Sequence, residues 1–177
     1  MKDKPIILVG LMGAGKTSIG RALAKRLKIP FIDLDQEIES ISGSSVIDIF
    51  TIYGEPEFRR IEEQVFERIL TTPPVVKVIS TGEGAFMTPR IRKLSLDYAL
   101  TIWLKADLPL LEKRTGLRST RPQLLVAEPS KILSKLIDER YPIYAQAKIV
   151  IETADEPRAR TLRKVLDAII DNDGQKL

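Results

Sequence analysis

Residues 10–17 read Gly10-Leu11-Met12-Gly13-Ala14-Gly15-Lys16-Thr17, and they directly follow the apolar run Ile6-Ile7-Leu8-Val9. This octet fills every fixed position of the phosphate-binding P-loop pattern, Gly-x-x-x-x-Gly-Lys-Ser/Thr. The alternative is a purely structural role, in which these residues form a glycine turn between a strand and a helix. Because the apolar run before the octet and the helical pattern after it supply the context that the P-loop requires, we predict a site for nucleotide phosphates.

The residue types in the loop suit a polyphosphate ligand. Backbone N–H groups must turn inward around phosphate oxygens, and a Cβ at Gly13 or Gly15 would obstruct them. Lys16 would neutralise the terminal phosphates, and Thr17 would offer its hydroxyl to Mg²⁺ at the start of a helix expected over 17–27. The nucleotide contacts expected from the loop are Gly13, Ala14, Gly15, Lys16, Thr17 and Ser18.

Composition narrows the chemistry. The 177 residues include no cysteine and no histidine, which excludes disulfides, thiolate nucleophiles, Ser-His-Asp triads and zinc sites built on those side chains. A general base must therefore be sought among carboxylates near the P-loop. No apolar stretch is long enough to span a bilayer and no signal-peptide core follows Met1, so we expect a soluble protein of the cytoplasm with no membrane partner.

The net charge of +4 is unevenly distributed. No acidic residue lies between Lys113 and Ala127, and the same stretch carries Arg114, Arg118 and Arg121. Such a cluster suits an anionic ligand. Nucleic acid is the rival ligand, but the stretch has no aromatic side chain for base stacking and aromatic residues make up only 6% of the chain, so we expect no nucleic-acid partner.

Short apolar runs alternate with helical patterns along the chain. This alternation predicts an α/β fold in which a five-stranded parallel sheet is flanked by helices. The length is typical of one domain, so we expect a single domain over 1–177. Strands are expected at 6–9, 30–33, 75–80, 100–104 and 148–152. Helices are expected at 17–27, 57–70, from Pro89 onward, 129–145 and 157–171.

Polar residues follow two of the predicted strands. Asp33-Leu34-Asp35 comes after the second strand, and Ser80-Thr81-Gly82-Glu83-Gly84 comes after the third. In open parallel sheets, ligands bind outside the carboxyl ends of the strands, so both segments should open on the same crevice as the P-loop. Helix capping is the alternative role for either aspartate taken alone.

Several blocks of sequence resemble the shikimate kinase family, in the same order and at similar spacings over about residues 5–155. The blocks are Phe31-Ile32-Asp33-Leu34-Asp35, Glu37-Ile38, Ile47-Asp48-Ile49-Phe50, Gly54-Glu55, Glu57-Phe58-Arg59-Arg60-Ile61-Glu62, Arg121-Pro122 and Arg140-Tyr141-Pro142-Ile143-Tyr144. A P-loop alone fits many kinases, whereas the Phe-Arg-Arg and Arg-x-Pro-x-Tyr blocks together are specific. The resemblance implies a three-layer P-loop kinase fold. It also implies transfer of the ATP γ-phosphate to the 3-hydroxyl of shikimate, giving shikimate 3-phosphate and ADP in the chorismate and aromatic amino-acid pathway.

The resemblance also implies roles for residues around the crevice. Asp35 matches the aspartate that accepts hydrogen bonds from the acceptor hydroxyls and serves as base, in keeping with a chain that lacks histidine. Asp33 matches the aspartate that holds Mg²⁺ together with Thr17. Arg59 and Arg140 match the pair that grips the substrate carboxylate, a task that suits the planar guanidinium fork.

Further roles follow from the same resemblance. Arg121 matches an arginine on a mobile lid, expected around 115–127, that closes on the phosphates while Lys16 assists from the opposite side. Arg114 is expected to face the adenine. The helical region around 35–62 is expected to bind the acceptor. The implied partners are ATP and shikimate with Mg²⁺ as the metal, and we expect a monomer.

One departure from the family pattern concerns the segment after the third strand. The family carries three consecutive glycines there and the middle one approaches the substrate, whereas this chain reads Gly82-Glu83-Gly84. A carboxylate about 4 Å from the substrate carboxylate would repel it by roughly 4 kcal/mol at an effective dielectric near 20, or about a thousandfold in affinity. We expect Glu83 to point into solvent while its N–H still serves the substrate. The alternative is that it pairs with Arg59 or Arg140 and imitates the substrate carboxylate.

The sequence is therefore compatible with three functions. The first is shikimate kinase, which requires consumption of shikimate that depends on ATP and Mg²⁺. The second is a kinase of another small hydroxy acid such as gluconate, which the change at Glu83 would permit. The third is a catalytically weak or idle regulatory relative that binds nucleotide without turnover. The sequence favours the first, since the remaining residues implied by the resemblance are intact.

Overall fold

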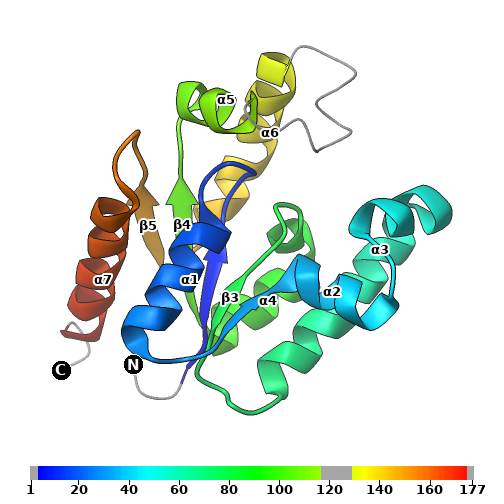
Figure 1. Ribbon diagram of the computed structural model, residues 1–177, viewed down its shortest axis with the longest axis horizontal. Coiled ribbons are helices and arrows are strands. Elements are labelled where there is room, and N and C mark those ends of the chain that lie inside the picture. Colours follow the sequence, from blue (N-terminus) through cyan, green and yellow to red (C-terminus); the bar gives the residue numbers. More distant parts are fainter. Residues whose placement is uncertain (1–3, 117–128, 175–177) are drawn as a thin grey trace.

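The computed structural model describes residues 4–116 and 129–174. Its sheet has five parallel strands in the order β2-β3-β1-β4-β5 (Figure 1), which confirms the predicted fold class. The strands are β1 (Ile6–Val9), β2 (Phe31–Asp33), β3 (Val78–Ser80), β4 (Leu100–Lys105) and β5 (Ile149–Glu152). The third strand is shorter than the predicted 75–80, because Val75 is exposed and Lys77 instead donates to the carbonyl oxygens of Ile69 and Thr72.

Helices cover both faces of the sheet and give the predicted three layers (Figure 1). Along β1, Ile6 and Leu8 belong to one buried cluster, with residues of α1 and α7, whereas Ile7 and Val9 belong to a second cluster, with residues of α3, α4 and α6. A strand buried on both faces explains why the sequence reads as a continuous apolar run. The helices are α1 (Lys16–Leu27), α2 (Leu34–Ser42), α3 (Val46–Thr71), α4 (Pro89–Tyr98), α5 (Leu108–Gly116), α6 (Pro129–Tyr144) and α7 (Arg158–Gly174), with a 3₁₀ turn at η1 (Ala85–Met87).

The segment between β2 and β3 is more helical than predicted. The structure adds α2 and extends α3 back to Val46, whereas the prediction began at 57. The sequence pattern stopped there because Gly54 and Pro56 interrupt it, and the structure bends the helix at Gly54, where φ is 80°. The first half is capped by Ser45, whose hydroxyl accepts a hydrogen bond from the Asp48 N–H at 3.0 Å. Helix α5 was likewise not predicted.

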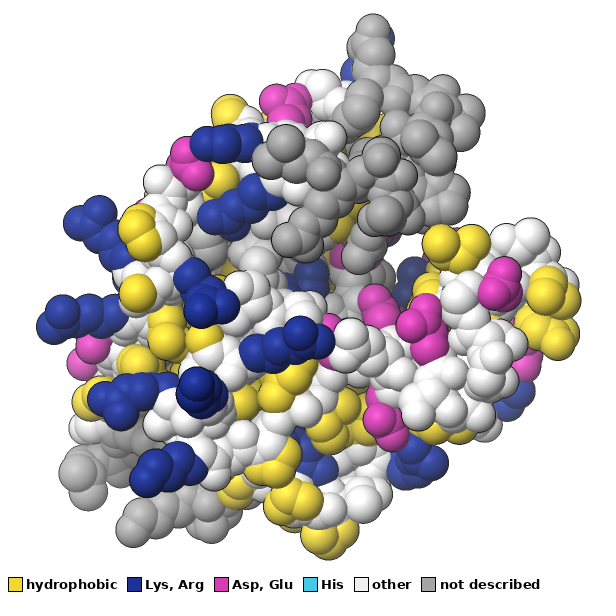
Figure 2. All heavy atoms as spheres, viewed as in Figure 1, with side chains coloured by type: hydrophobic (Ala, Val, Ile, Leu, Met, Phe, Trp, Pro, Cys, Tyr) yellow, Lys and Arg dark blue, Asp and Glu magenta, His cyan; other side chains and the backbone are white. Residues whose placement is uncertain are grey.

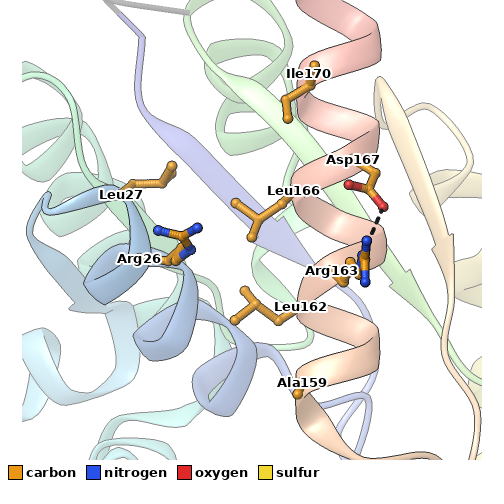
Figure 3. Close-up of a pocket in the computed structure, with 8 residues that line it drawn as sticks. All are labelled: Arg26, Leu27, Ala159, Leu162, Arg163, Leu166, Asp167 and Ile170. Atoms are coloured by element: carbon orange, nitrogen blue, oxygen red, sulfur yellow. Dashed lines mark ion pairs between the residues drawn. The ribbon is translucent and has the colours of Figure 1, made fainter.

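A groove of about 620 Å³ lies between α1 and α7, away from the polar strand ends (Figure 3). Leu27, Leu162 and Leu166 line it, and its rim carries Arg26 and the loose ion pair between Arg163 and Asp167. None of the predicted site residues lines this groove, so we place the chemistry elsewhere.

Within residues 4–116 and 129–174, no helix is both long enough and apolar enough to cross a membrane.

Candidate active site

A cavity of about 540 Å³ opens at the carboxyl ends of the strands, where Figure 2 shows the surface hollowed between the part that carries α1 and the α2–α3 segment. The segments that follow β1, β2 and β3 all contribute to its wall, as predicted for an open parallel sheet. The predicted site residues that line it are Gly13, Ala14, Gly15, Lys16, Thr17, Ser18, Asp33, Asp35, Gly82, Glu83 and Arg114.

The P-loop adopts a conformation that requires glycine. Gly13 has a φ of 78° and Gly15 a φ of 96°, so a side chain at either position would be strained whatever the space around it. Gly15 also stands at the N-cap of α1, so the amino end of that helix faces the cavity. The Lys16 ammonium donates to the carbonyl oxygens of Gly10 and Leu11 at 2.7 and 3.0 Å, which holds it on the loop.

Three oxygen-bearing side chains meet beside the loop. The Thr17 hydroxyl donates to Asp33 Oδ2 at 2.8 Å and lies 3.4 Å from the Ser80 hydroxyl. Asp33 occupies the N-cap position of α2, but its side chain makes no capping hydrogen bond, so the capping alternative does not account for it. Asp35 lies one residue inside the helix and faces the cavity. Hard oxygen donors of this kind are the ligands that Mg²⁺ prefers in proteins.

Arg114 reaches the P-loop from α5. Its guanidinium donates to the carbonyl oxygens of Gly13 at 3.3 Å and Ala154 at 3.0 Å, so it joins the loop to the segment after β5. The neighbouring Lys113 pairs with Asp155 at the surface. Arg114 therefore lies where a nucleotide above the loop would meet it, although which part of a nucleotide it contacts stays a prediction.

On the acceptor side, Arg59 is held by two carboxylates of α3. Its guanidinium donates to Glu62 Oε2 at 2.7 Å and to Glu55 Oε1 at 3.2 Å, and it lies 5.2 Å from the centre of the Phe58 ring. Burial opposes ionisation of Arg59, but the attraction of Glu62 and Glu55 holds the pKa of the guanidinium above its ordinary value. Arg59 is therefore charged and fixed in direction, as a carboxylate-binding group needs to be.

Glu62 is the most deeply buried carboxylate near the site. Its side chain is 1% exposed, and burial raises the pKa of Glu62 to about 7 against the opposing attraction of Arg59. Among the described residues, its Oε1 has no hydrogen-bond partner. A nearby negative charge on Asp35 raises the pKa further.

The segment Gly82-Glu83-Gly84, which we call the acceptor segment, brings the acceptor-side groups together. A Cβ built on Gly82 would lie 2.7 Å from Asp35 Oδ1, and one built on Gly84 would lie 2.2 Å from Arg59 Nη2. These two glycines are therefore in direct contact with the aspartate and the arginine. Arg140, on α6, lies 3.5 Å from Glu83 Oε1 through its Nη1.

The expected direction of Glu83 is wrong. Its side chain is only 12% exposed and points to Arg140 instead of solvent. The cause is tertiary: the Tyr144 hydroxyl donates to the carbonyl oxygen of Glu83, which ties the acceptor segment to the same helix that carries Arg140. Burial raises the pKa of Tyr144, so its hydroxyl stays a donor.

Sequence reasoning missed several residues at the site. Glu62 belongs to one of the motif blocks, but no role was predicted for it. The available signal was its place three residues after Arg59, on the apolar face of the helix that contains Phe58 and Val65. The far wall of the cavity is formed by residues after β5 that no motif marked: Thr153, Glu156, Arg158 and Thr161. Arg118, Arg121 and most of the predicted lid at 115–127 lie outside the described residues.

A central parallel strand that feeds a glycine-rich loop, with carboxylates at the end of another strand of the same sheet, defines a P-loop nucleotide-binding kinase. A sequence profile of the shikimate kinase family matches residues 12–170. The chain belongs to this family, whose members are ATP-dependent kinases that act on a hydroxyl of shikimate.

Individual relatives agree with this assignment. The chain is 46% identical to the shikimate kinase of Paramagnetospirillum magneticum over 167 residues, which cover 94% of this chain and 85% of the relative. It is 44% identical to that of Mesorhizobium japonicum over 167 residues, covering 94% and 81%. A solved shikimate kinase from Acinetobacter baumannii, in complex with shikimate, superposes with a TM-score of 0.90 at 34% identity and covers 97% of this chain and 95% of that one.

Proposed function

We propose that this protein transfers the γ-phosphate of ATP to the 3-hydroxyl of shikimate, with Asp35 as base and with Arg59 and Arg140 binding the acceptor carboxylate. The observation that carries the proposal is the convergence of these three side chains on the acceptor segment at the edge of the P-loop cavity. Arg59 and Arg140 lie 24 and 105 positions beyond Asp35 in the sequence. They meet at this segment, where Arg59 contacts Gly84 and Arg140 contacts Glu83. A role in binding one small molecule accounts for such an arrangement.

Asp35 suits the role of base. It lines the cavity at the carboxyl end of β2, beside Gly82 and near the buried Glu62 side chain. In this reaction the acceptor hydroxyl loses its proton as the oxygen attacks the terminal phosphorus, and the bond from that phosphorus to the ADP oxygen breaks. Asp35 would accept the hydroxyl proton, and Lys16 together with the amino end of α1 would stabilise charge on the phosphates.

Magnesium fits the oxygen donors beside the P-loop. Mg²⁺ is usually bound by one or two protein oxygens together with substrate phosphates and waters, so Thr17 and Asp33, with Ser80 close by, suffice. Within the described residues, no group of three or more histidine, cysteine, aspartate or glutamate side chains could hold a metal, and this mode of binding requires none. When bound, the ion would neutralise charge on the phosphates, while Thr17 and Asp33 would fix its place.

The choice of acceptor rests on the family and on the two arginines. The Acinetobacter baumannii protein is described in complex with shikimate, a small carboxylic acid, and the pair of guanidinium groups suits a carboxylate of that kind. A gluconokinase from Sinorhizobium meliloti superposes with a TM-score of only 0.58 at 17% identity and indicates the shared fold alone. Shikimate is therefore favoured over gluconate.

The test is a coupled assay of ADP release, with and without shikimate, followed by a panel of other small hydroxy acids. We expect release that depends on shikimate and Mg²⁺. Asp35→Asn should lower kcat by at least about a hundredfold with ATP affinity retained. Glu37→Gln is the matched control, since Glu37 lies on the same helix and pairs with Arg68 at the surface. ADP release with gluconate but not shikimate, or ATP binding without turnover of any acceptor, would contradict the proposal.

The assembly and the location of the enzyme belong to the same proposal. We propose a monomer that acts in the cytoplasm as a single domain over 1–177, with Arg121 closing over the phosphates from the predicted lid. Analytical ultracentrifugation tests the first point: a mass near twice the 19.9 kDa of the chain would contradict it. Arg121→Ala should lower kcat with little effect on shikimate affinity.

A further inference from the structure

Glu83 stands between the cavity and one of the two arginines. It lines the cavity at the acceptor segment, and its Oε1 lies 3.5 Å from Arg140 Nη1. Both side chains are largely buried, at 12% and 18% exposure. A carboxylate of the protein itself therefore lies at the cavity wall and contacts Arg140.

The backbone at this position does not exclude a side chain. Lys28 is the one non-glycine residue with a positive φ in the described part of the chain, so Glu83 takes an ordinary backbone conformation. Its neighbours differ, because a Cβ on Gly82 would overlap Asp35 and a Cβ on Gly84 would overlap Arg59. Position 83 is thus the place in the acceptor segment where a side chain enters the site without displacing the groups around it.

The contact between Glu83 and Arg140 leaves one donor of Arg140 unsatisfied. Arg140 Nη1 is buried and has no hydrogen-bond partner among the described residues, since 3.5 Å with Glu83 Oε1 does not amount to a hydrogen bond. Burying such a donor unsatisfied costs free energy, which a ligand oxygen at hydrogen-bond distance would recover. Arg59 differs, since it already donates to Glu62 at 2.7 Å.

We propose that Glu83 is an internal carboxylate that competes with the carboxylate of the acceptor for Arg140 and thereby sets the acceptor affinity of this enzyme. The proposal rests on the proposed function and deepens it. Binding of shikimate requires the Glu83 carboxylate to leave Arg140, so the acceptor KM is raised while kcat and the KM for ATP are not. This weakening of binding applies to acceptors that carry a carboxylate. Uncharged analogues do not need Arg140, so their affinity is unaffected.

The experiment measures KM for shikimate, KM for ATP and kcat in the full chain and in Glu83→Gly and Glu83→Gln, two variants that remove the charge with and without the bulk. We expect the shikimate KM to fall about 10- to 100-fold, the range between exposed and buried ion pairs, with kcat and the ATP KM changed less than about twofold. Glu57→Gln, which removes a surface charge paired with Arg60, is the matched control.

A second arm uses the carboxamide analogue of shikimate as a competitive inhibitor. Its affinity should be the same with and without Glu83, whereas the affinity of shikimate should rise. Equal gains for both compounds would mean that Glu83 acts by its bulk, and an unchanged or raised shikimate KM would mean that it does not compete; either result overturns the proposal. If no variant phosphorylates shikimate, the proposed function fails as well, and this outcome is distinct from active enzymes with equal KM values.

Discussion

The buried carboxylate of Glu62 should make the stability of this protein depend on pH in a way that one substitution abolishes. Glu62 is 1% exposed and burial raises its pKa from an ordinary 4.5 to about 7. Between pH 4.5 and about pH 7, Glu62 is therefore protonated in the folded state and ionised in the unfolded chain. This contribution to stability is fully present below about pH 4.5 and is lost as pH rises through about 7.

The size of the effect follows from the two pKa values. Each unit corresponds to about 1.4 kcal/mol, so the full contribution is about 3 kcal/mol, of which about 2.5 kcal/mol is lost between about pH 5 and pH 8. Glu62→Gln replaces the acid with a neutral amide of similar shape and removes the titration. The free energy of unfolding of the native chain minus that of Glu62→Gln should therefore fall by about 2.5 kcal/mol over this interval.

The assay is urea unfolding at several values between about pH 5 and pH 8, followed by tryptophan fluorescence of Trp103, the one tryptophan of the chain. Glu63→Gln is the control, because Glu63 is the next residue on α3 and is only partly buried. Its curve should parallel that of the native chain. If the Glu62→Gln curve also runs parallel, Arg59 keeps Glu62 ionised throughout and the argument from burial is refuted.

Three further predictions concern packing, a tyrosine hydroxyl and the proposed magnesium site. Gly20→Ala gains about 1 kcal/mol of helix propensity, but its Cβ would lie 2.6 Å from the Phe31 ring. Overpacking costs about 1–3 kcal/mol, so the melting temperature should fall, and a rise would contradict this. Tyr141→Phe removes the donor to the buried Ala106 carbonyl oxygen and should cost about 1–3 kcal/mol in urea unfolding, which an unchanged midpoint would refute. Thr17→Val should raise the Mg²⁺ concentration needed for half-maximal activity by about tenfold or more, and an unaltered requirement would count against its role as a ligand.

Local sequence was enough for the features that depend on contiguous residues. The P-loop is a run of eight residues whose conformation follows from its glycines, so its place between β1 and α1 was predicted within one residue. The parallel sheet was predicted from the alternation of short apolar runs with helical patterns along the chain. Helix α3 was predicted only from residue 57, because Gly54 and Pro56 interrupt the helical pattern and Gly54 has a non-helical φ of 80°.

What the sequence by itself determined is the class of fold, the phosphate loop and the part of the crevice that follows β1, β2 and β3. Only the tertiary structure decided how the acceptor side is charged. The direction of Glu83 depends on Tyr144 and Arg140, about sixty residues further along the chain, and the raised pKa of Glu62 depends on its burial in the folded protein. Backbone conformation responds to neighbours in sequence, whereas ion pairing and desolvation respond to neighbours in space, and these are fixed only when α3 and α6 pack around the end of β3.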